Sequence, residues 1–141
     1  ALFPDENAPL GRLSRVREQL DDLVKAGIVT KRLDANGREC WGEKLQRVIY
    51  NGIPVDVVGV HDPRTWGVQL AIRTGPAEFS RRLVTPRHAG GFLPMGMEIR
   101  DGFLLYDRQK PRPCLKEVDF FDALGIPYVK PYDRTTYGAP R

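Results

Sequence analysis

The sequence predicts an α+β fold, and three observations lead to that prediction. Near the start of the chain, apolar residues recur at helical spacing, as in an amphipathic helix. Two dipeptides that favour tight turns, Asn51-Gly52 and Asp101-Gly102, each separate two β-prone runs. Short helical patterns lie between these runs and after them. We therefore expect a helix with mainly antiparallel strands, followed by a small lobe of helices and a hairpin.

The first predicted helix begins at Leu10. One of its faces is apolar and the opposite face is charged, which is typical of a surface helix. Gly27 follows at the place where a C-terminal cap is expected. Residues 1–9, which include two prolines, predict an irregular lead-in. The apolar positions of the helix are Leu13, Val16, Leu20, Leu23 and Val24.

An antiparallel sheet is predicted next. A short β-prone run covers residues 28–33, and two longer runs, 46–50 and 53–60, flank Asn51-Gly52. Because side chains alternate along a strand, Ile53, Val55 and Val57 should share one face, and Pro54, Asp56 and Val58 the other. An acidic residue among valines on such a strand is unusual, since a buried carboxylate needs a charged partner or a metal ion.

Two helices are expected between the hairpins. Asp62-Pro63 is typical of a helix start, and the helical pattern continues toward Ile72 before it breaks at Thr74-Gly75. A second helix should follow Pro76 and end near Pro86. Phe79 and Leu83 form its apolar side, and Arg81 and Arg82 form its basic side.

The C-terminal third predicts smaller elements. Residues 97–100 and 103–106 should form the second hairpin, and 115–124 a short helix closed by Gly125. Residues 126–141 contain three prolines and predict an irregular tail. With a boundary near residues 87–91, the expected parts are 1–88 and 89–141. The inward positions of the short helix should be Leu115, Val118, Phe121 and Leu124.

Composition narrows the function only slightly. The 141 residues carry a formal net charge of +4 with a pI near 9.3, which is compatible with a polyanionic partner but common in other proteins. No apolar run approaches the roughly 18 residues of a membrane span, so we expect no membrane partner. The two cysteines, Cys40 and Cys114, support neither a zinc site nor a disulfide framework. A first residue of Ala1 rather than Met indicates a processed or excised piece.

Three groups of residues could carry chemistry, and each has two interpretations. Asp56 fits a metal-binding or base carboxylate, and fits equally well a strand residue paired with an arginine. The break at Thr74-Gly75 could present helix amide groups to a phosphate, although an ordinary helix corner is more common. The basic pairs Arg81-Arg82 and Arg87-His88 could contact DNA phosphates, although a solvated charged face is the usual case.

Taken in order along the chain, several segments resemble one known family. The chain is similar over residues 40–134 to the C-terminal palm and thumb of family X (polymerase-beta-like) DNA polymerases, most closely the short bacterial or phage members. In that family a hydrophobic-Asp-hydrophobic strand precedes a helix that ends in Thr-Gly, and an acidic, Phe-rich helix leads into a Pro-Tyr stretch. The matching segments are Trp41–Lys44, Val55–Val58, Trp66–Arg81, Gly91-Phe92, Asp101-Gly102 and Glu117–Val129.

The resemblance implies specific roles. Asp56 matches the third catalytic carboxylate, which binds the catalytic metal ion. This ion is Mg²⁺, which Mn²⁺ can replace. The implied nucleotide-binding residues are Arg73, Thr74, Gly75 and Ser80. The implied DNA-binding residues are Lys44, Arg81, Arg82 and Arg87. On this basis residues 1–88 would be part of a palm that lacks its first strands, and 89–141 a thumb-like lobe.

The chain also departs from the family pattern. The family has two further carboxylates, Asp-x-Asp, on an earlier strand, and this chain has no such pair at that place. The aromatic pair expected before Thr-Gly is here Ile72-Arg73, and the basic residue expected two positions before the third aspartate is Pro54. The nucleotide contacts therefore differ from the family's.

The leading hypothesis is a part of a nucleotidyltransferase that adds a nucleoside monophosphate from a dNTP to a DNA 3′-end. Its first two carboxylates would come from a preceding palm segment or from another chain, so this chain alone should be inactive. The expected partners are primer-template or gapped DNA and a dNTP, in the cytoplasm of a bacterial or phage-infected cell. One alternative is a degenerate, non-catalytic module that binds DNA or a protein. A further alternative is a nucleotidyltransferase for small substrates or RNA.

Overall fold

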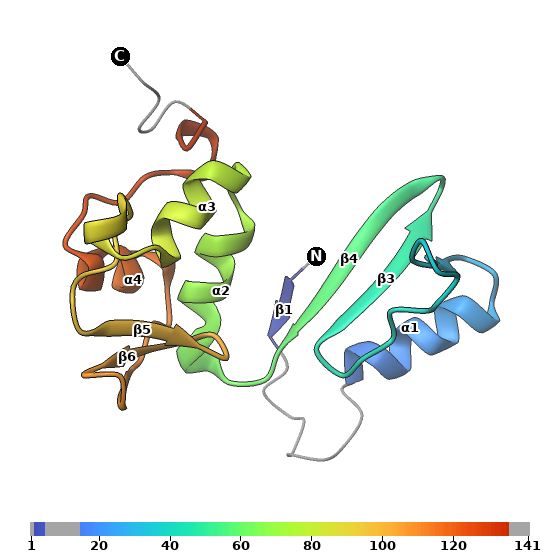
Figure 1. Ribbon diagram of the computed structural model, residues 1–141. Coiled ribbons are helices and arrows are strands. Elements are labelled where there is room, and N and C mark those ends of the chain that lie inside the picture. The colour runs from blue at the N-terminus through green and yellow to red at the C-terminus, as the bar shows by residue number, and fades with distance from the viewer. Residues whose placement is uncertain (1, 5–14, 136–141) are drawn as a thin grey trace. The chain divides into compact units, whose positions relative to one another are not determined.

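The computed structural model describes residues 2–4 and 15–135 and confirms the predicted α+β class. The chain forms two compact units, Ala1–Asp62 and Pro63–Arg141, each of which contains a sheet and helical structure of its own (Figure 1). None of the helices in the described ranges is long and apolar enough to cross a membrane.

The first unit contains a four-stranded sheet in the order β1-β4-β3-β2. The strands are β1 (Leu2–Pro4), β2 (Thr30–Lys31), β3 (Leu45–Tyr50) and β4 (Ile53–Val60). β1 runs parallel to the end of β4, with Leu2 opposite Val58, and the other pairs are antiparallel. The lead-in was therefore predicted wrongly for residues 2–4, which form a strand. The rest of the lead-in after Pro4, and the predicted helix start at Leu10, lie outside the described residues.

Helix α1 (Arg15–Lys25) packs along one face of the β3–β4 hairpin (Figure 1). Gly27 ends it in the left-handed conformation at φ 73°, and the amide of Ile28 donates to the carbonyl of Leu23 over 3.0 Å. The predicted cap is confirmed. The core beneath the helix consists of Leu20, Val29, Val48 and Val57, with Val16, Leu23, Val24, Trp41 and Val55 packed against it.

The β3–β4 hairpin forms where the sequence predicted it. Asn51 and Gly52 adopt φ values of 48° and 75°, the conformation of a type I′ turn. This turn sets Tyr50 opposite Ile53, and the register continues along both strands. Val55 and Val57 share a face, as predicted, and this face packs on α1, so Asp56 projects from the opposite face of the sheet.

The second unit begins with a 3₁₀ turn, η1 (Pro63–Thr65), followed by α2 (Trp66–Arg73) and α3 (Ala77–Val84). A 3₁₀ turn, η2 (Arg87–Ala89), leads into an antiparallel sheet in the order β5-β6-β7. Its strands are β5 (Met97–Arg100), β6 (Phe103–Tyr106) and β7 (Lys110–Arg112), of which β7 was not predicted. Helix α4 (Glu117–Leu124) and the turn η3 (Pro131–Asp133) complete the unit.

The core of the second unit lies among α2, α3, α4 and the sheet. Phe79 and Leu83 of α3 are buried in it, as predicted. For α4 the prediction was partly wrong, because Leu115 and Val118 are 55% and 44% exposed while Phe120 is fully buried. The helix begins only at Glu117, and the side that packs on α2 carries its aromatic residues.

Gly67 allows α2 to approach the segment before α4 closely. A Cβ atom at this position would lie 2.1 Å from the carbonyl oxygen of Lys116, and the Gly67 amide donates to the carbonyl of Cys114 over 2.7 Å. Because α2 and α3 share their core with α4, the compact units divide between Asp62 and Pro63. The sequence placed the division between the palm-like and thumb-like parts later, between His88 and Ala89.

Candidate functional site

Asp56 is exposed on the face of β4 that points away from α1, opposite Arg47 of β3. Its Oδ1 accepts a hydrogen bond from Nη2 of Arg32 over 3.1 Å and lies 3.5 Å from Nε of Arg47. The Asp56 side chain remains 44% exposed. The arginine pairing that the sequence left open is therefore present, and the carboxylate is still accessible to a further ligand.

Lys44 lies just before β3, in the same unit as Asp56. Its side chain is exposed, and its carbonyl accepts a hydrogen bond from the amide of Gly59 over 3.0 Å. Lys44 is therefore level with Gly59, three residues along β4 from Asp56, or roughly 10 Å at the usual rise of a strand. The remaining predicted site residues all belong to the second unit.

The corner between α2 and α3 is held by Arg134, a residue that the sequence did not single out. The Arg134 side chain is fully buried. Its Nη1 donates to the carbonyl oxygen of Thr74 over 3.0 Å and to the Thr74 hydroxyl oxygen over 2.6 Å. Its Cδ would lie 3.1 Å from a Cβ atom placed on Gly75. Thr74 and Gly75 thus form a corner closed from the inside by an arginine.

Arg134 is also paired with a carboxylate. Its Nη2 donates to Oε1 of Glu117 over 2.9 Å, and its Nε donates to the carbonyl of Val129 over 3.0 Å. Its guanidinium carbon lies 5.5 Å and 5.3 Å from the ring centres of Phe79 and Phe121. A buried charge needs this many partners, because an unpaired one costs several kcal/mol.

Glu117 links the corner to the segment after α4. Its Oε2 accepts a hydrogen bond from the hydroxyl of Tyr128 over 3.0 Å, while Oε1 lies 3.1 Å from the Thr74 hydroxyl. Burial and then the hydrogen bond to the Glu117 carboxylate raise the pKa of Tyr128 above its usual value. The Thr74 hydroxyl also lies 2.6 Å from the carbonyl oxygen of Leu70, so its polar atoms already have partners within the fold.

Arg73 and Ser80 flank this corner. Arg73, the last residue of α2, is exposed. The Oγ atom of Ser80 in α3 is buried, and it has no hydrogen-bond partner within the described part of the chain. Of the four predicted nucleotide-binding residues, Arg73 therefore presents its side chain to solvent, and Thr74 is occupied by structural contacts.

The predicted DNA-binding arginines differ in their surroundings. Arg81 is exposed and pairs with Glu78 over 2.8 Å. The guanidinium of Arg82 lies over the ring of Phe92, 5.2 Å from its centre. Arg87 donates to the carbonyl of Leu124 over 2.5 Å and so caps the C-terminus of α4. Arg87 thus has a structural role, and Arg81 and Arg82 have exposed or half-exposed side chains.

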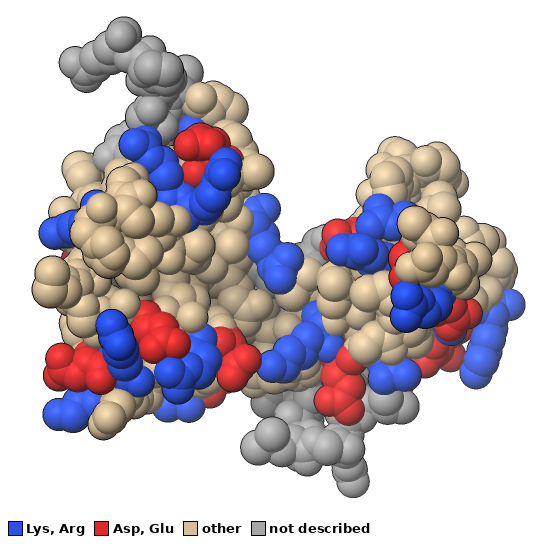
Figure 2. All heavy atoms as spheres, viewed as in Figure 1, with Lys and Arg blue, Asp and Glu red and all other residues tan. Residues whose placement is uncertain are grey.

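Charged side chains of both signs are visible in Figure 2. On the face shown in Figure 2, basic and acidic side chains are interspersed over both units. Among residues 2–4 and 15–135, no three His, Cys, Asp or Glu side chains are placed to hold one metal ion. Asp56 by itself therefore does not fit a two-metal centre, which needs further carboxylates.

No protein-family model matches the chain, and no curated protein matches it.

Sequence reasoning missed Arg134, Glu117 and Tyr128 as one connected group. Arg134 lies in the Pro-rich tail, for which the sequence predicts an irregular structure. It is 60 residues away from Thr74 along the chain. One signal was available: Glu117 stands at the first position of an acidic helix, where a carboxylate is favourable near the helix N-terminus.

Proposed function

We propose that this chain is the palm and thumb part of a family X polymerase-like nucleotidyltransferase. The intact enzyme adds a nucleoside monophosphate from a dNTP to a DNA 3′-end in the cytoplasm. Two divalent ions, if held in this enzyme by Asp56 and two further carboxylates, would stabilise the attacking and the leaving oxygen atoms of an in-line displacement. Asp56 supplies one carboxylate to this two-metal centre, and residues outside this chain supply the other two carboxylates.

The register of β1 on β4 is the observation that supports this proposal best. Leu2 pairs in parallel with Val58, so β1 covers only the last part of β4. A strand segment that preceded Leu2 in the same register would lie beside Val57, Asp56 and Val55. Paired residues of adjacent strands share a face, and residues two apart share it too. An Asp-x-Asp pair at the residue opposite Asp56 and two before it would therefore place three carboxylates together.

The accessibility of Asp56 also supports the proposal. Its carboxylate is 44% exposed on the face away from α1, so neighbouring carboxylates and ions can approach it. Arg32 and Arg47 would limit the repulsion when further negative charge gathers there. In the second unit, the corner at Thr74 and Gly75 is rigidly held, which suits a surface that receives a nucleotide.

Primer extension tests the proposal. The 141-residue chain should extend no primer, whereas a longer chain from the same gene, with a preceding Asp-x-Asp strand, should do so with Mg²⁺. Asp56→Asn in that longer chain should abolish extension, while Glu39→Gln, which removes an exposed carboxylate of the same sheet unit, should not. A gene that encodes no Asp-x-Asp before Ala1, or extension that survives Asp56→Asn, would reject the proposal.

A second candidate function is a non-catalytic module that binds DNA or a protein partner. The observation that favours it is the pairing of Asp56 with Arg32 and Arg47, which satisfies the carboxylate without a metal ion. If the chain is such a module, Mg²⁺ and Mn²⁺ should leave the nuclear magnetic resonance signals of the residues around Asp56 unchanged. The same should hold in the longer chain. Metal-dependent shifts there would favour the enzyme.

A further inference from the structure

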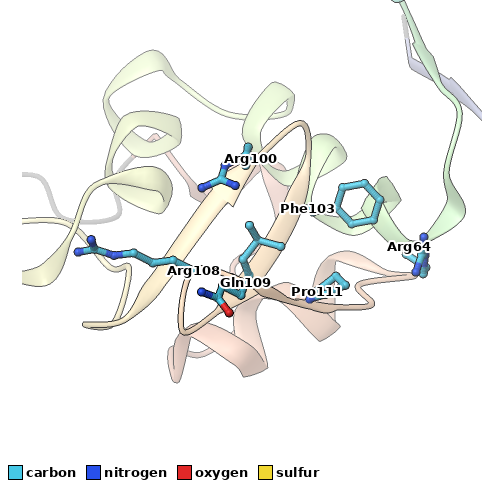
Figure 3. A pocket seen from close by; sticks show the side chains of 7 residues that line it. Arg64, Arg100, Phe103, Arg108, Gln109 and Pro111 are labelled. Carbon is cyan, nitrogen blue, oxygen red and sulfur yellow. The ribbon is translucent and has the colours of Figure 1, made fainter.

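A shallow pocket of about 450 Å³ lies on the outer face of the β5–β6–β7 sheet, in the second unit. Figure 3 shows Phe103 and Pro111 between Arg64 at one end of the pocket and Arg108 at the other, with Arg100 between these ends. The volume lies within the range of small-ligand sites, about 300–1,000 Å³. Its lining residues are Arg64, Arg100, Phe103, Leu105, Arg108, Gln109 and Pro111.

The strand register explains why these side chains gather. Arg100 pairs with Phe103, and Leu105 pairs with Pro111, so these four residues share one face of the sheet. Leu104 points the other way and is fully buried in the core. The outer face therefore has an apolar and aromatic floor, which arginines surround.

The arginines at the rim are differently engaged. The guanidinium of Arg64 lies over the Phe103 ring, 5.2 Å from its centre. Nη2 of Arg100 donates to both carboxylate oxygens of Glu98, over 3.0 and 3.1 Å. Arg108 is exposed and makes no ion pair within the described part of the chain. Arg108 is thus the donor that a ligand can use without displacing a carboxylate.

The turn that carries Arg108 is conformationally costly. Asp107 and Arg108 have φ values of 48° and 58°, and the turn is closed by a 2.9 Å hydrogen bond from the Gln109 amide to the Tyr106 carbonyl. Asp tolerates a positive φ better than most residues, but Arg does so rarely. Two positive φ values in succession are the conformation of a tight hairpin turn, which here connects β6 to β7. This turn lies at the rim of the pocket.

We propose that this pocket binds one nucleotide unit, with its phosphate at Arg108 and Arg100 and its base on the floor of Phe103, Leu105 and Pro111. An aromatic ring with adjacent arginines is the combination by which proteins bind single-stranded nucleic acid without sequence preference. The same chemistry fits a free mononucleotide. This site is separate from the proposed phosphoryl transfer and needs neither Asp56 nor the basic side of α3.

A binding experiment with two probes separates the two sources of the nucleotide. Fluorescence anisotropy with labelled (dT)₁₀ should show salt-dependent binding that Arg100→Gln with Arg108→Gln weakens about tenfold. The same double variant should reduce the slope of log K against log salt by about 0.7, the value for the one phosphate that is no longer neutralised. If dTMP competes as effectively as the oligonucleotide, the ligand is a free nucleotide. If only the oligonucleotide binds, the ligand is a strand.

A matched control removes the same charge from elsewhere in the unit. Lys110→Gln with Lys130→Gln takes away two exposed cations that do not line the pocket, and binding should stay within about twofold. Equal losses of affinity in both double variants would mean a general charge effect and would overturn the proposal. The absence of binding by both probes would overturn it as well.

A measurement on the unaltered protein covers the case in which a variant fails to fold. Titration with dTMP or (dT)₁₀, followed by nuclear magnetic resonance, should shift the Nε–H signals of Arg64, Arg100 and Arg108. Phe103→Leu, which keeps the apolar floor but removes the aromatic face, should weaken binding at least about fivefold. Shifts confined to α3 would contradict a nucleotide site on the sheet.

Discussion

Arg134 donates a hydrogen bond to Glu117 over 2.9 Å in the interior of the second unit, where the two side chains are 0% and 11% exposed. This ion pair joins the chain after η3 to the start of α4. Through Thr74 it also fixes the corner between α2 and α3. A pair of this kind is costly to break from one side, because the remaining charge stays buried.

Arg134→Met should lower the free energy of unfolding by about 3–5 kcal/mol, since it leaves the Glu117 carboxylate without its charged partner. Urea unfolding followed by circular dichroism measures the loss. Combined with Glu117→Gln, the change should cost less than the sum of the two single changes. Arg73→Met, at the exposed end of α2, is the control and should stay within about 0.5 kcal/mol. Additive single costs would contradict a direct pair.

Gly67→Ala should destabilise the second unit, although alanine normally favours a helix over glycine by about 1 kcal/mol. The added Cβ would lie 2.1 Å from the Lys116 carbonyl oxygen, so α2 must move away from the segment before α4. We expect a loss of about 1–3 kcal/mol or more in urea unfolding. Gly42→Ala is the control, because its Cβ would meet only the Leu45 carbonyl at an ordinary 3.7 Å. If Gly67→Ala increased the free energy of unfolding, α2 and the segment before α4 would not be in close contact at this position.

Cys114 should make stability fall with pH in the alkaline range. Burial raises the pKa of its thiol from 9.0 to about 11. The charge of Arg112 lowers this pKa in part, and the charge of Asp119 raises it further. The folded protein therefore holds the proton more tightly than the unfolded chain. This contribution is complete below pH 9 and disappears as the pH rises through 11, by about 3 kcal/mol in total. The unfolding free energy of Cys114→Ala should lack this part of the slope, and identical slopes would contradict it.

Asp56→Asn should change stability little in this chain. The pairs of Asp56 with Arg32 and Arg47 are half exposed, and such pairs contribute about 0–1 kcal/mol. Glu39→Gln, which breaks the exposed pair with Lys31, should have an effect of the same size and serves as the control. Urea unfolding checks both. A loss above about 2 kcal/mol for Asp56→Asn would indicate that the residue is there for the fold rather than for a ligand.

Arg81→Ala with Arg82→Ala should weaken binding of duplex DNA and flatten its salt dependence, by about 0.9 in slope for each phosphate that these arginines neutralise. Arg15→Ala with Lys25→Ala removes two exposed charges from α1 and is the matched control. Anisotropy with a labelled duplex at several salt concentrations measures both. An unchanged slope in the α3 variant would assign these arginines to a solvated face.

The elements that the sequence predicted correctly depend on local backbone preferences. Asn51-Gly52 and Asp101-Gly102 made the two hairpins predictable, because few residue pairs accept two positive φ values in succession. Gly27 and Gly125 marked the ends of α1 and α4 for the same reason. The third strand of the second sheet escaped prediction because Lys110–Arg112 is short, charged and interrupted by Pro111.

For the candidate site, the sequence determined that Asp56 lies on a strand, on the face opposite to that of Val55 and Val57. Only the tertiary structure decided that Arg32 and Arg47 pair with it, because those partners come from other segments of the sheet unit. The same holds for Arg134, which lies in a tail without a regular pattern and bonds to Thr74, 60 residues earlier. Turn and cap preferences act over a few residues and can be read locally. A buried charge finds its partners through packing across the whole unit, and no local pattern specifies them.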